Sequence, residues 1–187
     1  KFNSSLDMRM NNSSGLTAIN VVNEYTEKEL SDVFFYYGDF KDSKKIAKQI
    51  FNKRNEKEII STYDLVAALE GLFSEKNKNK YLARIFQAIR IEVNDEINSL
   101  KKLLNDATKL LKSEGRLVVI SYHSLEDRLV KNLINKGSID GKSNQDFFGK
   151  VTKIYTPINK RVIIPNDEES KKNKRSRSAK LRIAEKI

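Results

Sequence analysis

Cysteine and tryptophan are absent from the sequence, and histidine occurs once, at position 123. The lack of cysteine excludes disulfides, thiolate metal sites and a cysteine nucleophile. A single histidine also excludes a histidine-rich metal centre, so no metal is expected. Only 2 prolines and 7 glycines punctuate the chain, and the glycines form no G-x-G cluster. No apolar run reaches the roughly 20 residues that span a bilayer and no signal-peptide pattern opens the chain, which favours a cytoplasmic protein without a membrane partner.

Length and charge narrow the class of protein. The chain has 187 residues, 39% of them hydrophobic, which suffices for one core domain, with or without a small subdomain. Its 36 Lys and Arg against 25 Asp and Glu give a net charge of +11. Residues 171–187 hold eight cations and one anion, so most of the excess lies there. A concentrated cationic end favours RNA or DNA as partner, the alternative being a solvated, disordered tail.

The front of the chain has helical signals. Ser or Thr followed three residues later by Glu or Asp forms a capping box, as at Thr26 with Glu29 and at Ser61 with Asp64. Together with apolar residues at spacings of three and four, these signals predict a short helical piece before residue 24 and helices over 26–38, 43–54 and 61–71. Residues 74–80 are polar without periodicity and are expected to form a surface loop.

The back of the chain has mixed signals. Residues 81–112 predict one long amphipathic helix or two nearly collinear ones. The apolar run Arg116–Ser121 lies between helical patterns and predicts a buried parallel strand. A helix over 124–135 and a loop over 136–149 are expected to follow. The remainder predicts short strands over 151–156 and 161–164, a charged linker over 167–174 and a half-exposed strand over 179–185. The fold class is therefore α/β.

Four segments resemble one known family, and they occur in the order that the family has. They are Leu6–Met10 (LDMRM), Phe86–Ile97 (FQAIRIEVNDEI), Val119–Arg128 (VISYHSLEDR) and Arg175–Arg182 (RSRSAKLR). The sequence is similar in these segments to the ribosomal small-subunit RNA (cytosine-N4) methyltransferase family, also called MraW. Two mild departures are Asn11, where the family usually has Asp, and Tyr122, where it usually has Phe.

The resemblance implies a class I methyltransferase that uses S-adenosyl-L-methionine. Its substrate would be the exocyclic N4 of a cytidine in the decoding region of 16S ribosomal RNA, with the 30S subunit as partner. The family fold is a Rossmann-like sheet with an inserted helical domain. On that map residues 1–11 are a loop of the catalytic domain, 12–80 are the inserted substrate-recognition domain, and 81–187 are the C-terminal half of the catalytic domain with a basic, RNA-contacting end.

The family's first half is not found in the chain. A glycine-rich turn lets the cofactor approach backbone amides at a helix N-terminus, and no such turn is present. We therefore expect an N-terminally truncated member whose cofactor-binding residues lie outside this chain. Alone, the chain is expected neither to bind S-adenosyl-L-methionine tightly nor to turn over. A catalytically inactive RNA-binding module is the alternative function. A helical DNA-binding or scaffold protein is disfavoured because the basic cluster is not on a recognition helix.

The resemblance also indicates catalytic residues. His123 follows the strand Arg116–Ser121 at the edge where α/β sheets place ligands, and it would line the cytidine pocket with Ser124. The alternative is that His123 caps the next helix. Asp7 is the second catalytic candidate. The lack of cysteine independently excludes the covalent thiolate route to C5 of cytosine.

The remaining candidates would bind substrate. Glu126 and Asp127 either contact substrate or are first-turn residues that suit the helix dipole. Arg9 lies in a substrate-side loop or pairs with Asp7 to hold that loop, and Asn94 is expected to tie the long helix to the His123 loop. Four cations of the basic end are expected to bind RNA phosphates, because guanidinium and ammonium groups hydrogen-bond phosphate oxygens well. The alternative is that they pair with carboxylates of the protein body. These residues are Arg175, Arg177, Lys180 and Arg182.

The strand Arg116–Ser121 also bears on oligomeric state. If strands that would normally pair with it are absent, its free edge can pair with another chain. Dimerisation or poor solubility of the isolated chain is therefore expected, and a homodimer joins the RNA as a candidate partner.

Overall fold

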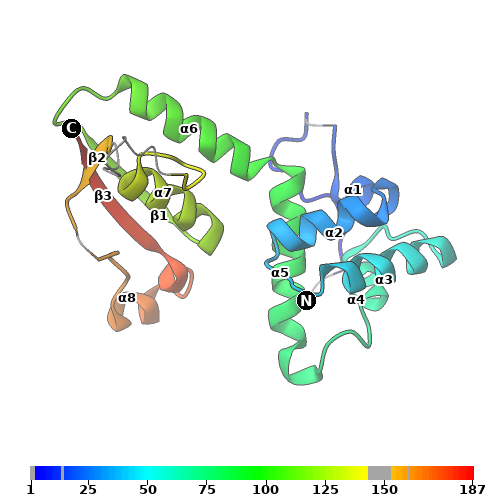
Figure 1. Ribbon diagram of the computed structural model, residues 1–187. Coiled ribbons are helices and arrows are strands. Elements are labelled where there is room, and N and C mark those ends of the chain that lie inside the picture. Colours follow the sequence, from blue (N-terminus) through cyan, green and yellow to red (C-terminus); the bar gives the residue numbers. More distant parts are fainter. Residues whose placement is uncertain (1–2, 14, 143–152, 160) are drawn as a thin grey trace. The chain divides into compact units, whose positions relative to one another are not determined.

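The computed structural model describes residues 3–13, 15–142, 153–159 and 161–187 (Figure 1). The chain divides into two compact units, Lys1–Glu96 and Ile97–Ile187, here called the helical unit and the sheet unit. The described residues form eight α-helices and a three-stranded sheet, so the predicted α/β class is confirmed. None of the described helices is long and apolar enough to cross a membrane.

Five helices build the helical unit. Their bounds are α1 Ala18–Glu24, α2 Glu27–Tyr36, α3 Ser43–Glu56, α4 Thr62–Ala68 and α5 Glu75–Val93. The capping boxes predicted at Thr26 and Ser61 are both present, and a third occurs at Thr17 with Asn20. In each box the hydroxyl accepts from one free backbone N–H while the partner side chain accepts from another. Local sequence therefore sets where these helices begin.

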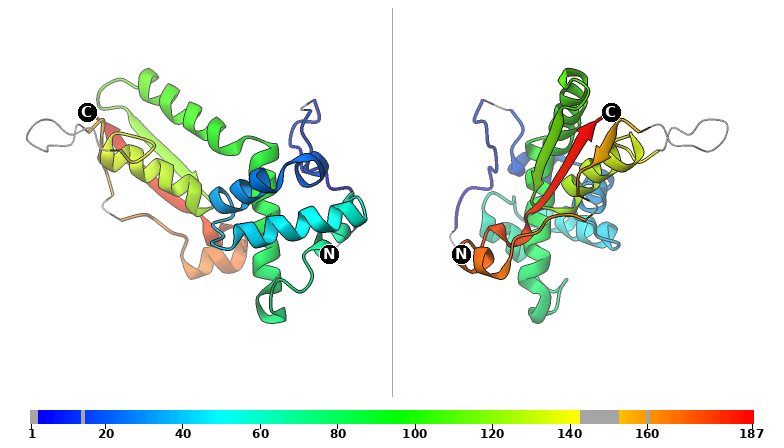
Figure 2. Two further views of the ribbon diagram at one scale, coloured as in Figure 1. Left: turned by 45° about the vertical axis from the view of Figure 1, so that its right-hand side comes forward. Right: turned by 90° about the vertical axis from the view of Figure 1, so that its left-hand side faces the viewer.

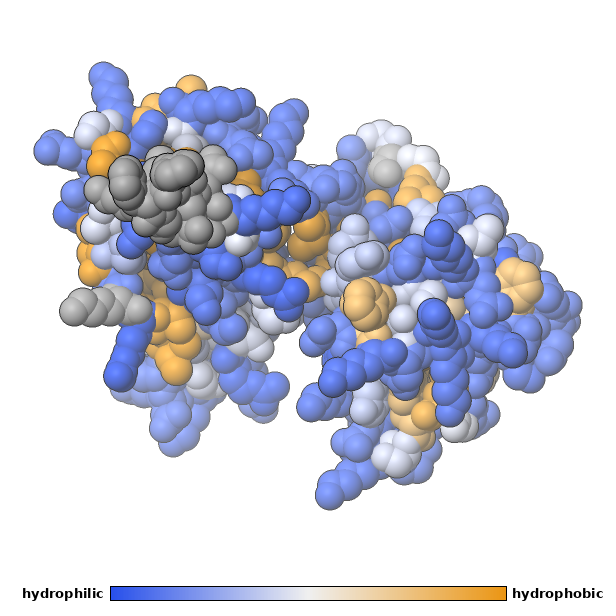
Figure 3. Space-filling model, in the orientation of Figure 1, coloured by the Kyte–Doolittle hydropathy of each residue, from blue (hydrophilic) through white to orange (hydrophobic). Residues whose placement is uncertain are grey.

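The helices enclose a single apolar cluster. Among the described residues, 19 buried apolar side chains belong to it, including Phe34, Ile46, Ile50 and Ile89, each 0% exposed. Leu6 from the opening segment is also fully buried there. In the space-filling view, hydrophilic side chains cover most of the visible face of this unit (Figure 3). The unit thus has an ordinary buried core that draws in the opening segment as well as the helices.

The structure corrects one prediction for the segment around α5 and decides between the alternatives of another. The loop expected over 74–80 is wrong, because α5 begins at Glu75 and Lys78 forms an ion pair with Glu75 one turn earlier. These Lys, Glu and Asn side chains need no apolar face, since the packed part of the helix downstream nucleates the first turns. Of the two forms left open for residues 81–112, two helices are found. They meet at Asp95, whose φ of 47° is left-handed and ends the helix.

The sheet unit is built on α6 Glu96–Leu110, which begins at the unit boundary, and on α7 Ser124–Lys136. Its strands are β1 Arg116–Ser121, β2 Tyr155–Pro157 and β3 Lys180–Lys186, in the order β1-β3-β2. Leu117 is paired with Ala184, and Tyr155 with Lys186. Both views of Figure 2 show β1 and β3 side by side. The half-exposed strand predicted over 179–185 is confirmed as β3.

The prediction of a buried parallel strand is wrong for β1. Within the described chain β1 pairs only with β3, and the pairing is antiparallel. Its burial alternates, so Leu117 packs inward while Val118 and Ile120 remain 58% and 57% exposed. Val118 and Ile120 stand opposite Ile183 and Leu181 on the same face, which leaves an apolar sheet face uncovered. The apolar run is continuous in the sequence because both faces of β1 carry apolar residues. Only one of these two faces is buried.

The C-terminal region is more regular than predicted. The charged linker expected over 167–174 contains α8 Asp167–Lys172, which Asn166 caps by accepting from the Glu169 N–H. Acidic residues in its first turn and lysines in its last turn match the helix dipole. The strand expected over 161–164 contributes only an isolated bridge from Ile163 to Leu181. Residues 151–152 of another predicted strand, and 143–149 of the predicted loop, lie outside the described residues.

Candidate functional site

The opening segment of the helical unit holds Asp7 and Arg9 as an ion pair. Arg9 Nε donates to Asp7 Oδ1 at 2.7 Å and Arg9 Nη2 donates to Asp7 Oδ2 at 2.8 Å. The Arg9 hydrogen bond lowers the pKa of Asp7 to about 2. Asp7 is therefore a carboxylate at any ordinary pH and a weak proton acceptor. Arg9 also donates to the Asn12 carbonyl oxygen at 3.1 Å, so it holds both ends of this loop.

Between these two residues the backbone is strained, and Asn94 holds it. Met8 has a φ of 63°, a left-handed conformation that an unbranched side chain adopts at a cost. The Asn94 amide donates to the Met8 carbonyl oxygen at 2.9 Å and accepts from the Met10 N–H at 2.7 Å. The same Nδ2 donates to the Arg90 carbonyl oxygen at 2.8 Å. Asn94 thus joins the end of α5 to the opening segment, whereas the sequence predicted the His123 loop as its partner.

A cavity of about 560 Å³ lies beside this segment within the helical unit. Leu6 and Met8 line it from the opening segment, and Phe86, Gln87 and Arg90 line it from α5. Arg90 is bound to Glu96 through Nε and Nη2, at 2.7 and 3.1 Å. No role for these three α5 residues was expected from the sequence. Arg90 lies four residues after Phe86 and three after Gln87, so it neighbours both on the helix surface, and that spacing within the segment Phe86–Ile97 is a signal that could have identified them.

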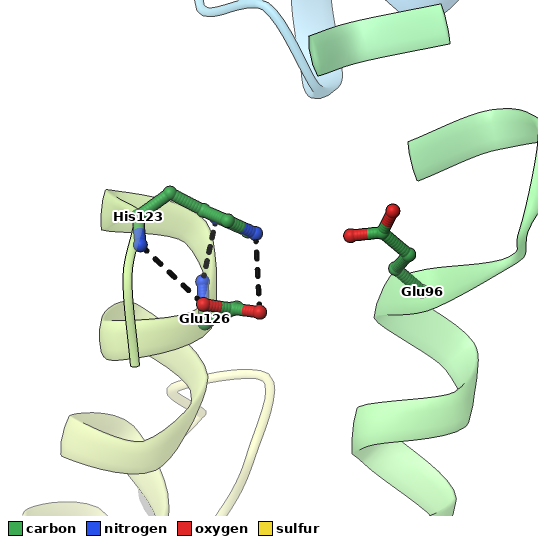
Figure 4. Close-up of side chains that lie close together, drawn as sticks. All are labelled: Glu96, His123 and Glu126. Atoms are coloured by element: carbon green, nitrogen blue, oxygen red, sulfur yellow. Dashed lines mark hydrogen bonds and ion pairs between the residues drawn. The ribbon is translucent and has the colours of Figure 1, made fainter. Parts of the chain in front are cut away.

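In the sheet unit, His123 caps α7. Its Nδ1 accepts from the Glu126 backbone N–H at 3.4 Å, while Glu126 Oε2 accepts from the Tyr122 N–H at 2.9 Å and the His123 N–H at 3.4 Å (Figure 4). This is a capping box with histidine in place of the usual Ser or Thr. The two side chains are therefore oriented by the first turn of α7. Ser124, the first residue of that helix, is exposed.

The capping geometry assigns the tautomer of His123. A neutral imidazole whose Nδ1 accepts a hydrogen bond carries its proton on Nε2. His123 Nε2 lies 3.2 Å from Glu126 Oε1, but it lacks the geometry of a hydrogen bond with any described residue. The side chain is 12% exposed, so this N–H is a nearly buried donor with unused capacity. Burial raises the pKa of Glu126, but its close contact with the His123 side chain and the backbone N–H groups of Tyr122 and His123 outweigh burial and keep that pKa below its ordinary value.

Asp127 ties α7 to β3. Arg182 Nε donates to Asp127 Oδ1 at 2.7 Å, Arg182 Nη2 donates to Oδ2 at 3.1 Å, and Lys180 Nζ donates to Oδ2 at 3.4 Å. Burial raises the pKa of Asp127, but these two cations outweigh it and hold the pKa below its ordinary value. Lys180 and Arg182 thus have a carboxylate of the body as their partner, which was the alternative to phosphate for these cations.

Arg175 and Arg177 are placed differently from the other two cations of their motif. Both are exposed, at the start and within the short 3₁₀ turn Ser176–Ser178, and neither side chain makes an ion pair with a described residue. Ser176 is buried and donates to the Asn173 carbonyl oxygen at 2.8 Å, which anchors the turn. The structure therefore presents two guanidinium groups to solvent from an anchored turn.

Comparisons with known proteins match the whole chain. The model of the MraW methylase family covers residues 1–187. Three relatives bear the name ribosomal RNA small subunit methyltransferase H. They come from Phocaeicola vulgatus (50% identical over 186 residues), Parabacteroides distasonis (49% over 187) and Flavobacterium johnsoniae (48% over 187). Each match covers 100% of this chain but only 61–62% of the relative.

Proposed function

The chain belongs to the MraW methylase family, and on this premise we propose that it is part of an enzyme that methylates small-subunit ribosomal RNA. The finer proposal is methyl transfer from S-adenosyl-L-methionine to the N4 amino group of a cytidine in the decoding region. One observation carries the proposal: relatives named as small-subunit ribosomal RNA methyltransferases are about half identical to the chain over its full length. Because the chain spans only about 61% of those relatives, activity, substrate and partners are proposals for this protein.

The proposed fold is one part of a Rossmann-like methyltransferase. In this proposal the three-stranded sheet is an edge of a larger sheet, and residues 12–80 are a helical insertion that recognises substrate. The unpaired edge of β1 in the described sheet supports the first statement, because further strands can pair there, and the uncovered apolar face of β1 and β3 indicates that another layer packs on it. The helical unit has a core of its own, which supports a distinct helical domain, and this core extends beyond residues 12–80 to Leu6 and to Ile85 and Ile89 of α5.

The residues present do not fit the methyl donor. A dinucleotide-type site needs a glycine-rich turn between a strand and a helix, with free amides at the helix N-terminus. The strand-to-helix turn between β1 and α7 has Tyr122 and His123 in it, and Glu126 already accepts from both of their N–H groups. We therefore place the donor on residues outside this chain and derive no step through it.

The chemistry left to the chain is to position the cytidine and manage a proton. The N4 lone pair of cytosine is delocalised into the ring, so an acceptor for the N4–H bonds would make the nitrogen more nucleophilic and take its proton afterwards. Glu126 is the carboxylate best placed beside His123 to accept a hydrogen bond from the N4 amino group, but its pKa lies below the ordinary value, so like Asp7 it is a poor final acceptor of the proton. His123 Nε2–H can donate to an acceptor on the base or ribose. A cytidine inside a duplex is out of reach, so a flipped or unpaired one is expected.

Asp7 and Arg9 have a more restricted role in this proposal. With a pKa of about 2, Asp7 can accept hydrogen bonds but is a poor proton acceptor at neutral pH. We propose that the Asp7–Arg9 pair and Asn94 hold the strained loop at Met8 beside the cavity, so that the loop can contact substrate. Strained backbone concentrates where geometry matters for binding.

Phosphate contacts fall to the exposed part of the basic end. Arg175 and Arg177 can bind phosphate oxygens bidentately, with the RNA or the 30S subunit as partner. The 3₁₀ turn Ser176–Ser178 would then be held in place by the start of β3, which is bound to α7 through the ion pairs of Lys180 and Arg182 with Asp127.

A chimera tests the proposal. Residues 1–187 would replace the matched segment of the Phocaeicola vulgatus relative, expressed in a strain that lacks its own enzyme. Mass spectrometry of nucleosides from its small-subunit RNA should show N4-methylcytidine, whereas the isolated chain should give no methylation and no micromolar S-adenosyl-L-methionine binding by titration calorimetry. A folded chimera that methylates another atom, or none, contradicts the proposed reaction.

The alternative of a catalytically inactive RNA-binding module has one observation in its favour: no strand-to-helix turn among the described residues fits a cofactor. An active chimera excludes it. We also propose that the isolated chain dimerises through β1, an edge strand of the described sheet. Light scattering after size-exclusion chromatography should show a dimer, and Val118→Lys with Ile120→Lys should give a monomer. A monomeric parent chain contradicts dimerisation.

A further inference from the structure

The helical unit has no net charge, but its charges are sorted between neighbouring helices. It contains 15 cationic and 15 anionic side chains. Residues of α2 sum to −2, whereas residues of α3 sum to +4. The net charge of the unit therefore does not reveal that α3 is strongly basic. The net charge of the whole chain does not reveal it either, because most of that charge lies in residues 171–187. A basic surface in a neutral unit needs an explanation other than overall composition.

Four lysines form a ridge on α3 and the residue before its cap: Lys41, Lys44, Lys45 and Lys48. Their spacings of three, four and seven put them on one side of the helix, opposite the buried side chains of Ile46, Ala47 and Ile50. All four are exposed, and none forms an ion pair within the part of the chain that the structure describes.

Other lysines of the unit are placed differently. Lys53 binds Glu56 at 2.9 Å, Lys57 binds Asp64 at 2.7 Å and Lys78 binds Glu75 at 3.1 Å. Carboxylates of this unit thus pair with other lysines, but none of them pairs with a lysine of the ridge. The unpaired state of the four ridge lysines is a local property of α3.

The ridge does not stabilise α3. Lys44 and Lys48 are like charges four residues apart, an arrangement that destabilises a helix. Lys44 and Lys45 lie in the first turn, where the helix dipole disfavours cations. The N-cap residue, Asp42, forms no side-chain cap hydrogen bond that could offset this. Folding alone therefore gives no reason for this arrangement.

Aromatic contacts fix more positive charge next to the ridge. The ring of Tyr81 stacks on Phe40 with centroids 5.8 Å apart, which places the start of α5 beside the residue that precedes Lys41. Arg84 lies over the Phe40 ring at 4.2 Å and donates to the Gly38 carbonyl oxygen at 2.7 Å. These contacts hold the loop before α3 rigidly, so Lys41 is presented from a fixed backbone.

We propose that the lysine ridge binds the phosphate backbone of the RNA substrate, which makes the helical unit a second RNA-binding surface besides Arg175 and Arg177. This inference rests on the proposed function for the identity of the polyanion. Residues 41–48 span about 10 Å along the helix, or about three nucleotides of one strand. Lysine ammonium groups are point charges without the fork that reads base edges, so the ridge should position RNA without selecting its sequence.

An acidic membrane is the less suitable occupant. Helices that bind membranes insert an apolar face between lipid headgroups. The apolar face of α3 is buried in the core of the helical unit, with Ile46 and Ile50 each 0% exposed. The ridge therefore offers charge on a helix whose own apolar face is buried, which suits binding to a nucleic-acid backbone better than insertion into a membrane.

The test compares two variants with equal loss of charge. K41Q/K44Q/K45Q/K48Q removes the ridge, and K53Q/K57Q/K78Q/K109Q removes four lysines that pair with carboxylates. Affinity of the whole chain for an end-labelled single-stranded RNA is measured by fluorescence anisotropy over a salt series, after circular dichroism has shown that each variant is folded. The ridge variant should lower the log–log salt slope by about 2–3 units and weaken binding about 30-fold or more near 0.1 M salt. The control should change the slope by less than about one unit.

Each other outcome has a distinct meaning. If both variants lose affinity equally, only net charge matters and the ridge proposal is overturned. If the ridge variant binds RNA like the parent while R175Q/R177Q loses affinity, the ridge proposal fails and RNA binding stands. Loss of binding only to vesicles rich in phosphatidylserine would identify a membrane surface instead and also overturn the proposal. A parent chain that binds no RNA would contradict the proposed function itself.

Discussion

The two units stabilise themselves in different ways. The helical unit encloses 19 described apolar side chains in one cluster and has no net charge. The sheet unit encloses only 8 in its cluster, while its 21 cationic and 10 anionic side chains account for the whole +11. It leaves Val118 and Ile120 exposed, and α7 and β3 are joined by the ion pairs of Asp127 with Arg182 and Lys180 in addition to the small apolar cluster. The comparison indicates that the helical unit is self-sufficient in apolar packing and the sheet unit is not.

The largest expected effect breaks the core of the helical unit. Leu30→Ala removes a fully buried side chain and leaves a cavity, so we expect a loss of about 3–5 kcal/mol in unfolding free energy. Because the chain lacks tryptophan, urea unfolding is followed by far-UV circular dichroism. The counterpart in the sheet unit is Leu133→Ala, and its smaller cluster should give a smaller loss, about 2–3 kcal/mol. Equal losses would show that the two cores are equally well packed.

The second prediction concerns the ionic bond of the sheet unit. Arg182→Gln leaves the Asp127 carboxylate without its bidentate partner, and we expect a loss of about 2–3 kcal/mol at pH 7. The control is Arg128→Gln, which removes an exposed arginine next to Asp127 on α7. Its unfolding free energy should stay within about 0.5 kcal/mol of the parent value. A loss below about 0.5 kcal/mol for Arg182→Gln would show that the bond contributes nothing to this unit.

The same bond predicts a pH dependence. The pKa of Asp127 in the folded chain lies below its ordinary value of 3.8, so its stabilisation is complete above that pH and is lost as the pH falls through the lower, folded pKa. Acid titration of Asp127→Asn should lack this loss, because an amide does not titrate. If parent and variant lose stability in parallel below about pH 4, other carboxylates account for the acid response.

A smaller effect tests whether one side chain holds the opening segment. Asn94→Ala removes the hydrogen bonds to Met8 and Met10, which should cost about 1–2 kcal/mol and speed amide exchange at Met10. Asn23 on α1 makes the same pair of amide hydrogen bonds with the Ile59 backbone. Asn23→Ala is therefore a matched control, which should speed amide exchange at Ile59 and leave exchange at Met10 unchanged. Unchanged exchange at Met10 in Asn94→Ala would contradict the assigned role.

The smallest expected effect on stability comes from a substitution at His123 that tests whether this residue has a catalytic role besides capping α7. Asparagine is a good N-cap, so His123→Asn should keep α7 and change stability by less than about 0.5 kcal/mol. In the chimera the same change should lower methylation by about 100-fold or more, because the Nε2–H donor is lost. Wild-type methylation by His123→Asn would leave His123 with a capping role only.

Local elements were the most predictable part of the fold. Capping boxes at Thr26 and Ser61 and apolar spacing of three and four placed α2, α3 and α4 correctly. Errors occurred at α8 and at the start of α5, where polar residues form helices without an apolar face. Such turns depend on capping and on the neighbouring helix, which hydrophobic periodicity does not register.

The sequence predicted some contacts of the candidate site residues but not others. The Asp7–Arg9 pair and the His123 cap were among its alternatives, and both are present. Asn94, however, bonds to Met10, 84 residues away, and Arg182 bonds to Asp127, 55 residues away. Sequence motifs give no distance between residues so far apart. The lysine ridge on α3 was readable from spacing alone, but its unpaired state was not.

The large net charge and the absence of cysteine follow from the sequence alone, as do most helix starts, because each depends on composition or on residues within one turn. Tertiary structure alone decided which charges are free. It commits Lys180 and Arg182 to a carboxylate on α7, and it leaves Arg175, Arg177 and the four ridge lysines exposed. It also decided that β1 is an antiparallel, half-exposed strand. The physical reason is the same in each case: pairing of charges and of strands is a contact between distant segments, and only the fold brings those segments within a few ångströms.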